Sequence, residues 1–325
     1  MTHNLLLTQA LPEPGMRLLA ARTDVRVTVL AAPIAPVLAA SLPGADGVIV
    51  VMEEPALTAA MIGAAARLRV ACRCGAGYDN VDVAALTARA VPLVTTGAAN
   101  ADTVAEHALY LMLALARRGP RLDRAVRAGA WPREFGAIEL RDGTCLVVGY
   151  GSIGRHVARL ARAFRMHVLV VDPGPGAEIA AQDGCTVVPT LHEALPDADF
   201  VVLACALTPT TRGLIDAAAL ARMKPSAFLV NVSRGPVVDE AALIAALEAR
   251  RLAGAGLDVL QTEPPLPDNP LLTRDDVVLT PHTAAYVATA YERMAIAAAE
   301  KTLAGLDGRL GPQDVVNPDA FSPGV

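Results

Sequence analysis

The hydrophobic pattern of this chain alternates between short apolar runs and longer amphipathic segments. The short runs are rich in Val, Ile and Leu and are bounded by Gly, Pro, Asp or Asn, as buried strands usually are. The longer segments repeat Ala, Leu and Arg with a helical period. Such alternation predicts βαβ units and parallel sheets. The predicted strands are residues 4–7, 25–30, 47–51, 68–72, 92–94, 144–148, 167–171, 200–204, 228–232, 256–259 and 277–279.

Two long helical segments suggest where the chain divides. Residues 100–118 form a helix that is long enough to bridge two bodies, and a second Ala-rich helix over 287–303 follows the last strand. The length of 325 residues suggests about two domains. We expect residues 1–99 and 288–325 to form one domain, with residues 100–287 inserted as the other.

The composition narrows the class of protein. With 53% hydrophobic and 19% charged residues, the chain can bury a large core, so global disorder is excluded. The net charge is −5 and the Arg residues are scattered, which argues against nucleic acid as a partner.

The start of the chain lacks the basic region of a signal peptide, and no apolar run is suited to span a membrane. We therefore expect a cytoplasmic protein. The five cysteines predict neither a disulfide framework nor a metal site.

The sequence GYGSIG, which begins at Gly149, fits the G-x-G-x-x-G pattern of dinucleotide-binding turns, and a predicted strand precedes it and a predicted helix follows it. Gly149 would allow the tight turn, Gly151 would let the backbone approach a pyrophosphate, and Gly154 would let the helix pack on the sheet. The start of the helix would offer free N–H groups to the phosphates. The segment therefore predicts a dinucleotide site.

Asp172 ends the next predicted strand, 23 residues after Gly149. A carboxylate at this point can accept hydrogen bonds from the adenosine ribose and repels a 2′-phosphate. The residues that follow, Pro173 and Gly174, supply no Arg to hold such a phosphate. The predicted cofactor is therefore NAD rather than NADP.

Three reactive side chains follow three further strands. Arg234, Glu263 and His282 each lie in a loop just after a predicted strand. Ligands of doubly wound sheets bind at the carboxyl ends of the strands, so these loops can converge on one crevice. Imidazole suits a proton transfer near neutral pH, and Arg fits a planar carboxylate with two hydrogen bonds. We expect Glu263 to favour the imidazolium form of His282.

These motifs resemble the D-isomer-specific 2-hydroxyacid dehydrogenase family over nearly the whole chain. The matching segments are CGAGYDNVD from Cys74, NADTVAEHAL from Asn100, GYGSIG from Gly149, LTPTTRGLID from Leu207, NVSRGPVVDE from Asn231, GLDVLQTEPP from Gly256 and TPHTAA from Thr280. The resemblance implies an α/β fold of two doubly wound parallel-sheet domains. A Rossmann NAD-binding domain (100–287) would be inserted in a flavodoxin-like substrate-binding domain (1–99 and 288–325).

The resemblance also implies roles for individual residues. Arg234 would hold the substrate carboxylate, His282 would act as the acid/base, and Glu263 would be its carboxylate partner. A substrate loop would cradle the carboxylate with its backbone N–H groups, and the residues implied there are Arg73, Gly75, Ala76 and Gly77. Besides the three glycines and Asp172, the implied cofactor contacts are Ser152, Ile153, Cys205, Val232, Ser233, Asp258 and Ala284. The family also implies a homodimer, with the segment 118–140 and its Trp131 as an interface arm.

The predicted activity is NAD-dependent interconversion of a small D-2-hydroxy acid and its 2-keto acid. After the third strand, Val51, Met52, Glu53 and Glu54 offer no positive charge for a phosphate, which favours a glyoxylate- or hydroxypyruvate-type substrate. The alternatives are a phosphoglycerate dehydrogenase-like enzyme and a non-catalytic NADH-sensing scaffold of the same fold. Formate and phosphite enzymes of this fold carry Gln in place of Glu263 and Lys in place of Ala76, which argues against those reactions.

Overall fold

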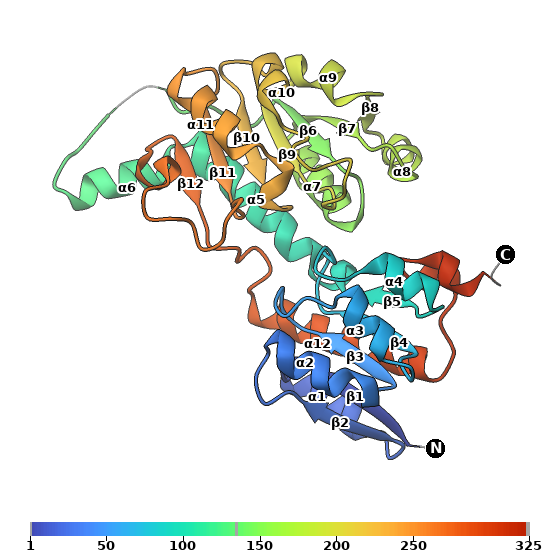
Figure 1. Ribbon diagram of the computed structural model, residues 1–325. Coiled ribbons are helices and arrows are strands. Elements are labelled where there is room, and N and C mark those ends of the chain that lie inside the picture. Colours follow the sequence, from blue (N-terminus) through green and yellow to red (C-terminus); the bar gives the residue numbers. More distant parts are fainter. Residues whose placement is uncertain (1, 134–135, 323–325) are drawn as a thin grey trace. The chain divides into compact units, whose positions relative to one another are not determined.

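The computed structural model describes residues 2–133 and 136–322 of the chain. These residues form two compact units, which Figure 1 shows as two α/β bodies. Unit 1 contains Met1–Asn100 and Tyr286–Val325, and unit 2 contains Ala101–Ala285. Unit 2 is thus inserted in unit 1 along the chain.

Unit 1 is built on a five-stranded sheet in which every neighbouring pair is parallel. Its order, β2-β1-β3-β4-β5, is that of flavodoxin-like folds. The strands are β1 (His3–Leu7), β2 (Val25–Val29), β3 (Gly47–Val50), β4 (Val70–Arg73) and β5 (Leu93–Thr95).

Helices cover both faces of this sheet. The helices are α1 (Glu13–Ala20), α2 (Ala35–Ser41), α3 (Ala59–Ala64), α4 (Val83–Ala88) and α12 (Ala288–Leu306), and 3-10 turns lie at Leu42–Gly44, Gly97–Asn100, Pro312–Asp314 and Pro318–Phe321. Leu38, Ile62 and Leu86 from α2, α3 and α4 pack on one face. On the other face α12 contacts β3 and β4 and lies against α1. There Gly15 lets the two helices approach closely, because a Cβ on it would lie 2.7 Å from the Ala295 carbonyl oxygen.

Unit 2 is built on a seven-stranded parallel sheet. Its order, β12-β11-β10-β9-β6-β7-β8, places the first strand of the unit, β6, inside the sheet, with the chain winding outward on both sides as in the Rossmann fold. The strands are β6 (Thr144–Val148), β7 (His167–Val171), β8 (Thr186–Val187), β9 (Phe200–Leu203), β10 (Phe228–Asn231), β11 (Gly254–Leu257) and β12 (Val277–Leu279).

Alternating side chains of β6 divide the core of unit 2 into two layers. Cys145 and Val147 belong to the layer under α5 and α7, whereas Leu146 and Val148 belong to the layer under α9, α10 and α11. The helices of the unit are α5 (Ala101–Ala116), α6 (Gly119–Arg127), α7 (Ser152–Ala163), α8 (Gly176–Gln182), α9 (Leu191–Ala194), α10 (Ala217–Arg222) and α11 (Glu240–Glu248), and 3-10 turns lie at Leu195–Asp197, Gly235–Val237 and Pro270–Thr273. Both predicted doubly wound sheets are therefore present.

Some local features differ from the expectation. Strand β11 is Gly254–Leu257 instead of residues 256–259, and α5 ends at Ala116 instead of residue 118. The edge strand β8, Thr186–Val187, was not predicted, because two residues carry no periodicity. Helix α5 begins at Ala101 rather than at residue 100, since a 3-10 turn over Gly97–Asn100 precedes it.

Candidate functional site

The glycine-rich turn between β6 and α7 has the geometry of a phosphate cradle. Gly149 has φ +91°, and a Cβ there would lie 2.7 Å from the Cα of Cys205. A Cβ on Gly154 would lie 2.0 Å from the Gly149 carbonyl oxygen, so α7 packs directly on the turn. Over Gly151, by contrast, the described residues place no atom within 4 Å of a Cβ. The turn therefore presents bare backbone to open space at Gly151.

Helix α7 begins at Ser152, and no described side chain caps its first turn. The N–H groups at this end, which include those of Ser152 and Ile153, are therefore available to an anion, and the helix dipole favours negative charge there. A dinucleotide diphosphate fits both the uncapped helix and the open face of Gly151.

Asp172 follows β7 and is held against the same turn. Its Oδ2 accepts a hydrogen bond from the Tyr150 N–H at 2.6 Å, and its Oδ1 accepts one from the Gly174 N–H at 2.7 Å. Gly176 leaves room for this carboxylate, because a Cβ there would lie 2.6 Å from Oδ2. The acidic side chain predicted to select NAD thus lies beside the predicted diphosphate turn.

His282 and Glu263 form a direct pair. Nδ1 of His282 lies 2.8 Å from Oε2 of Glu263, and Oε1 of Glu263 accepts a hydrogen bond from the Leu260 N–H at 2.9 Å. Both side chains are about one-third exposed. Burial alone would raise the pKa of Glu263, but the hydrogen bonds from His282 and Leu260 and the charge of Arg234 lower it below its usual value. Glu263 is therefore an anion that holds the imidazole from one side.

Arg234 lies in the loop after β10, which packs on the loop of Glu263. A Cβ on Gly235 would lie 1.9 Å from the Leu260 carbonyl oxygen, so no larger residue fits between the two loops. Asn231 fixes the loop, since its Nδ2 donates to the Arg234 carbonyl oxygen at 2.9 Å and its Oδ1 accepts from the Ser233 N–H at 3.0 Å. Unit 2 therefore brings together the three residues predicted to be catalytic.

The other predicted cofactor contacts lie in loops at the ends of neighbouring strands. Ser233 Oγ donates to the carbonyl oxygen of Cys205, which follows β9. Burial raises the pKa of the Cys205 thiol, so it is neutral near pH 7. The Val232 N–H donates to the Leu203 carbonyl oxygen at 3.4 Å. Ala284 donates its N–H to Oδ2 of Asp258 at 3.0 Å.

In unit 1, the loop after β4 has the form of an anion cradle. Gly75 has φ +151°, its carbonyl oxygen accepts from the Thr96 N–H at 3.1 Å, and Gly97 makes room for Ala76. Within residues 2–133 and 136–322, no acceptor engages the N–H groups of Gly75, Ala76 and Gly77. Successive free N–H groups of this kind can bind a carboxylate.

Arg73 lies beneath this loop. Its side chain is 4% exposed and pairs with Oε1 of Glu53 at 2.6 Å. It also donates to the Val51 carbonyl oxygen at 3.2 Å and to that of Cys74. In this geometry the guanidinium supports the loop, and the predicted direct contact between Arg73 and a substrate stays a prediction.

The sequence assigned no role to two residues that contact predicted site residues or their loops. His107 of α5 contacts Thr280, which precedes His282 by two residues. Glu53 neutralises Arg73. For His107 a signal was present, because a histidine on the helix face that carries the buried residues Val104 and Leu111 needs a polar partner.

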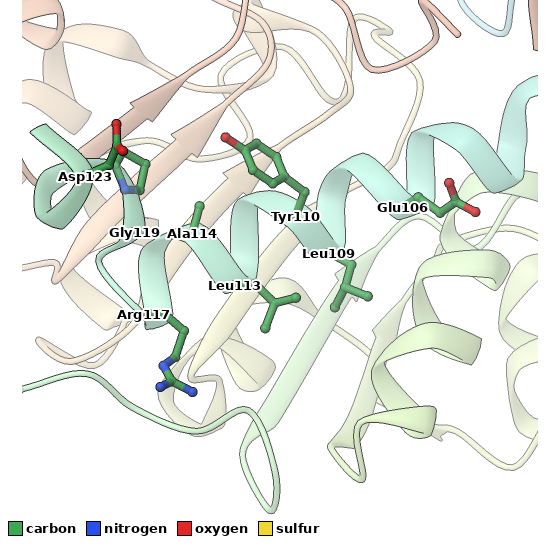
Figure 2. Close-up of a pocket in the computed structure, with 9 residues that line it drawn as sticks. Glu106, Leu109, Tyr110, Leu113, Ala114, Arg117, Gly119 and Asp123 are labelled. Atoms are coloured by element: carbon green, nitrogen blue, oxygen red, sulfur yellow. The ribbon is translucent and has the colours of Figure 1, made fainter. Parts of the chain in front are cut away.

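A groove of about 750 Å³ runs along α5 and α6, and Figure 2 shows its lining. Its wall is mainly apolar, with Leu109, Leu113 and Pro120, and its polar residues are Glu106, Arg117 and Asp123. None of the predicted catalytic or cofactor residues lines it. The groove is therefore separate from the glycine-rich turn and the His282 pair.

Two kinds of feature are not found in the described part of the chain. Within this part of the chain no helix is both long and apolar enough to cross a membrane. No group of three or more His, Cys, Asp or Glu side chains that could hold a metal ion occurs among residues 2–133 and 136–322.

The chain is similar to known proteins over most of its length. It is 43% identical to D-3-phosphoglycerate dehydrogenase of Archaeoglobus fulgidus over 238 residues, which is 73% of this chain and 45% of that protein. It is 41% identical to D-3-phosphoglycerate dehydrogenase of Mycobacterium leprae over 283 residues, which is 87% of this chain and 53% of that protein. The chain thus spans about half the length of the curated relatives it matches.

A solved structure shares the fold over nearly the whole chain. The crystal structure of D-lactate dehydrogenase from Aquifex aeolicus, complexed with NAD and lactic acid, has a TM-score of 0.85 and 26% identity and covers 97% of this chain and 99% of that one. Residues 109–284 match the NAD binding domain of the D-isomer specific 2-hydroxyacid dehydrogenases. With this match and relatives more than 40% identical, the chain belongs to the D-isomer specific 2-hydroxyacid dehydrogenase family.

Proposed function

We propose that this chain is an NAD-dependent dehydrogenase that interconverts a D-2-hydroxy acid and the corresponding 2-keto acid. The observation that carries the proposal is the 2.8 Å contact between His282 and Glu263, next to the loop of Arg234, in the unit whose residues 109–284 match the family's NAD-binding domain. An acid/base pair and a guanidinium are the groups that reduction of a keto acid requires.

The residues of unit 2 would divide the chemistry among them. When bound, NADH supplies the hydride that adds to C2 of the keto acid. The imidazolium of His282 donates a proton to the keto oxygen, and Glu263 orients the ring and stabilises its charge. Arg234 binds the substrate carboxylate through two hydrogen bonds and draws electron density from the keto group. In the direction of oxidation, neutral His282 accepts the hydroxyl proton.

We propose that unit 1 binds substrate through the loop of Gly75, Ala76 and Gly77. Support comes from their available N–H groups and from the positive φ of Gly75. A carboxylate accepts hydrogen bonds from successive backbone N–H groups without a counter-charge.

For the substrate itself, the relatives favour 3-phosphoglycerate and its keto acid over the glyoxylate-type substrate expected from the sequence. The Archaeoglobus fulgidus and Mycobacterium leprae relatives are both named D-3-phosphoglycerate dehydrogenase. Reduction would then convert 3-phosphohydroxypyruvate to 3-phosphoglycerate.

One observation favours a second candidate, a hydroxy acid with an uncharged tail. Beside the substrate loop, the guanidinium of Arg73 is already paired with the half-exposed carboxylate of Glu53. A phosphate would have to displace this carboxylate or bind next to it, and like charges at close range repel.

A substrate panel tests the function and separates the candidates. The purified protein is assayed with NADH, and in parallel with NADPH, against 3-phosphohydroxypyruvate, hydroxypyruvate and glyoxylate. The expected result is oxidation of NADH by at least one of these acids, with little activity from NADPH. A kcat/KM for 3-phosphohydroxypyruvate above that for hydroxypyruvate supports the phosphorylated substrate. Tight NADH binding without turnover of any 2-keto acid would overturn the proposal and favour the NADH-sensing scaffold.

The Glu53→Gln variant tests whether Glu53 disfavours a substrate with a phosphorylated tail. If Glu53 opposes a phosphate, Gln at this position raises kcat/KM for 3-phosphohydroxypyruvate about tenfold and changes kcat/KM for hydroxypyruvate much less. Glu54→Gln is the matched control, because it removes the same charge one residue away from the carboxylate that pairs with Arg73. Equal effects of both variants on both acids would show that Glu53 does not select the tail.

A further inference from the structure

His107 reaches from α5 to the loop that carries His282. Its Nε2 lies 2.9 Å from Oγ1 of Thr280 and 3.4 Å from Oδ1 of Asp258, and its side chain is mostly buried. Residues 107 and 280 are far apart in sequence. Their contact joins helix α5 to the end of β12, which is an edge strand of the sheet and ends at Leu279.

The direction of the hydrogen bonds fixes the tautomer of His107. Thr280 Oγ1 donates its proton to Oδ1 of Asp258 at 2.6 Å, so the hydroxyl oxygen is left as an acceptor for His107. The imidazole must therefore carry its hydrogen on Nε2. A side chain without a donor at this point would leave Thr280 without a partner on this side.

Asp258 is the centre of the cluster. Its Oδ1 also accepts the Thr283 N–H at 2.9 Å, and its Oδ2 accepts the Ala284 N–H at 3.0 Å. Burial opposes ionisation of this carboxylate, but the hydrogen bonds from His107, Thr280 and the backbone outweigh it and lower the pKa of Asp258 below its usual value. The ionised carboxylate thus anchors the loop on both sides of residue 282.

The backbone of His282 itself needs such an anchor. Its φ is +53°, in the left-handed region that a non-glycine residue seldom adopts. Its N–H donates to the Asp258 carbonyl oxygen at 2.7 Å, so the residue that binds Thr280, Thr283 and Ala284 through its side chain also binds His282 through its backbone. The direction in which the imidazole points therefore depends on Asp258.

We propose that His107 is a positioning residue, which holds Thr280 and Asp258 in place and thereby fixes the left-handed turn that aims His282 at its proton-transfer position. This inference rests on the proposed acid/base role of His282. His107 itself touches neither substrate nor cofactor in this scheme. Its contribution is to restrict the loop, because a displacement of about 1 Å at the reacting atoms can lower a rate about 10²-fold.

Two variants test the proposal. His107→Phe removes the Nε2 donor but keeps a ring against Tyr110, whose ring centroid lies 5.6 Å away. His107→Gln keeps an N–H donor at a comparable reach. We expect kcat for reduction to fall about 10- to 100-fold in His107→Phe. His107→Gln restores most of it, and the Kd for NADH changes less than threefold in either variant. His167→Phe, at an exposed position at the start of β7, is the control for the change of residue type.

A second measurement does not depend on activity. In ¹H–¹⁵N spectra of the histidine side chains, the Nδ1 proton of His282 that is shared with Glu263 gives a separate downfield signal. This signal should broaden or shift in His107→Phe and return in His107→Gln. If the wild-type protein reduces no 2-keto acid, the proposed function fails while this signal still reports on His107.

Three results would overturn the role of His107. One is an unchanged kcat together with an unchanged His282 signal in His107→Phe. Another is a loss of activity in which the free energy of unfolding and NADH binding fall together and His107→Gln restores neither. The last is a lower kcat in His107→Phe with a His282 signal that is unchanged from the wild type. The lower rate would then have a cause other than the orientation of the His282 ring.

Discussion

Glu263 and His282 set the pH dependence expected of this site. The carboxylate is an anion whose pKa is lowered by its partners, and it favours the charged imidazolium at 2.8 Å. Reduction needs the imidazolium, so kcat/KM for the keto acid should fall as the pH rises and this ring loses its proton. In Glu263→Gln we expect the midpoint of that fall to move down by about one pH unit. The measurement is kcat/KM against pH for both proteins.

The reverse reaction provides the control for this prediction. Oxidation of the hydroxy acid needs neutral imidazole, so its rise with pH should shift in the same direction in Glu263→Gln, and the variant should gain relative activity at low pH. An unshifted pH profile in both directions would show that Glu263 has no part in the proton-transfer step.

The pair of Glu263 and His282 also affects stability. Because folding lowers the pKa of Glu263, this carboxylate adds to the free energy of unfolding at a pH above its unfolded pKa. That contribution is lost as the pH falls toward the folded pKa.

Individual residues were predictable from the sequence only where they follow a strand or a glycine motif. Arg234, Glu263 and His282 could be placed at one sheet edge because strand ends can be recognised along the chain. The partner of Arg73 could not be predicted, since the pairing with Glu53 joins two loops that no motif relates. His107 has the same difficulty, because its contact with Thr280 depends on how α5 lies over β11 and β12.

At the scale of elements, two glycines of the turn from β6 to α7 have different tasks: Gly154 is needed for packing and Gly151 for binding. Gly154 has no room for a methyl group, because a Cβ would lie 2.0 Å from the Gly149 carbonyl oxygen. Gly154→Ala should therefore lower the free energy of unfolding by about 1–3 kcal/mol and weaken NADH binding as the helix moves off the turn. Urea unfolding and NADH fluorescence measure the two effects.

Gly151→Ala is the matched change in the same turn. Its φ of −73° suits any residue, and a Cβ there meets no described atom within 4 Å. We expect stability close to that of the wild type but a Kd for NADH raised at least tenfold, because the methyl group occupies the space left for the diphosphate. Wild-type NADH affinity in Gly151→Ala would show that the diphosphate does not lie over this residue.

Most elements could be predicted because parallel strands buried on both faces are continuous apolar runs, which stand out against Ala- and Arg-rich helices. The strand β8, Thr186–Val187, escaped because a two-residue edge strand is defined by its pairing with β7 rather than by its own pattern. The start of α5 was one residue off because Asn100 ends a 3-10 turn instead of capping the helix. Local pattern therefore predicts strands and helices, and pairing decides their ends.

At the scale of the whole molecule, the sequence order explains the two units. All five strands of the first sheet come from unit 1, and all seven strands of the second sheet come from unit 2. Each unit can therefore form its core without strands from the other. The family and its NAD-binding domain are confirmed, as is the predicted fold class. The assignment of unit 1 to substrate binding stays a prediction, which the Gly75 loop supports.

The groove along α5 and α6 leads to a prediction about assembly. Leu109, Leu113 and Pro120 line it, and Tyr110 on its edge is 49% exposed. Further along the chain Trp131 is 75% exposed, within the segment 118–140 predicted as an interface arm, of which residues 134–135 lie outside the described part. Exposed apolar surface of this kind favours contact with another protein. We predict that a second copy of the chain covers this groove.

Sedimentation velocity at micromolar concentration tests the dimer. The wild-type protein should sediment as a dimer, whereas Tyr110→Arg should sediment as a monomer, because removing a guanidinium from water costs more than a pairing with Glu106 or Asp123 in the covered groove returns. Ile34→Arg is the matched control, since Ile34 is 52% exposed and belongs to unit 1, whereas the groove belongs to unit 2. A dimer that survives Tyr110→Arg but dissociates in Ile34→Arg would move the interface to unit 1, and a monomeric wild type would rule out the dimer altogether.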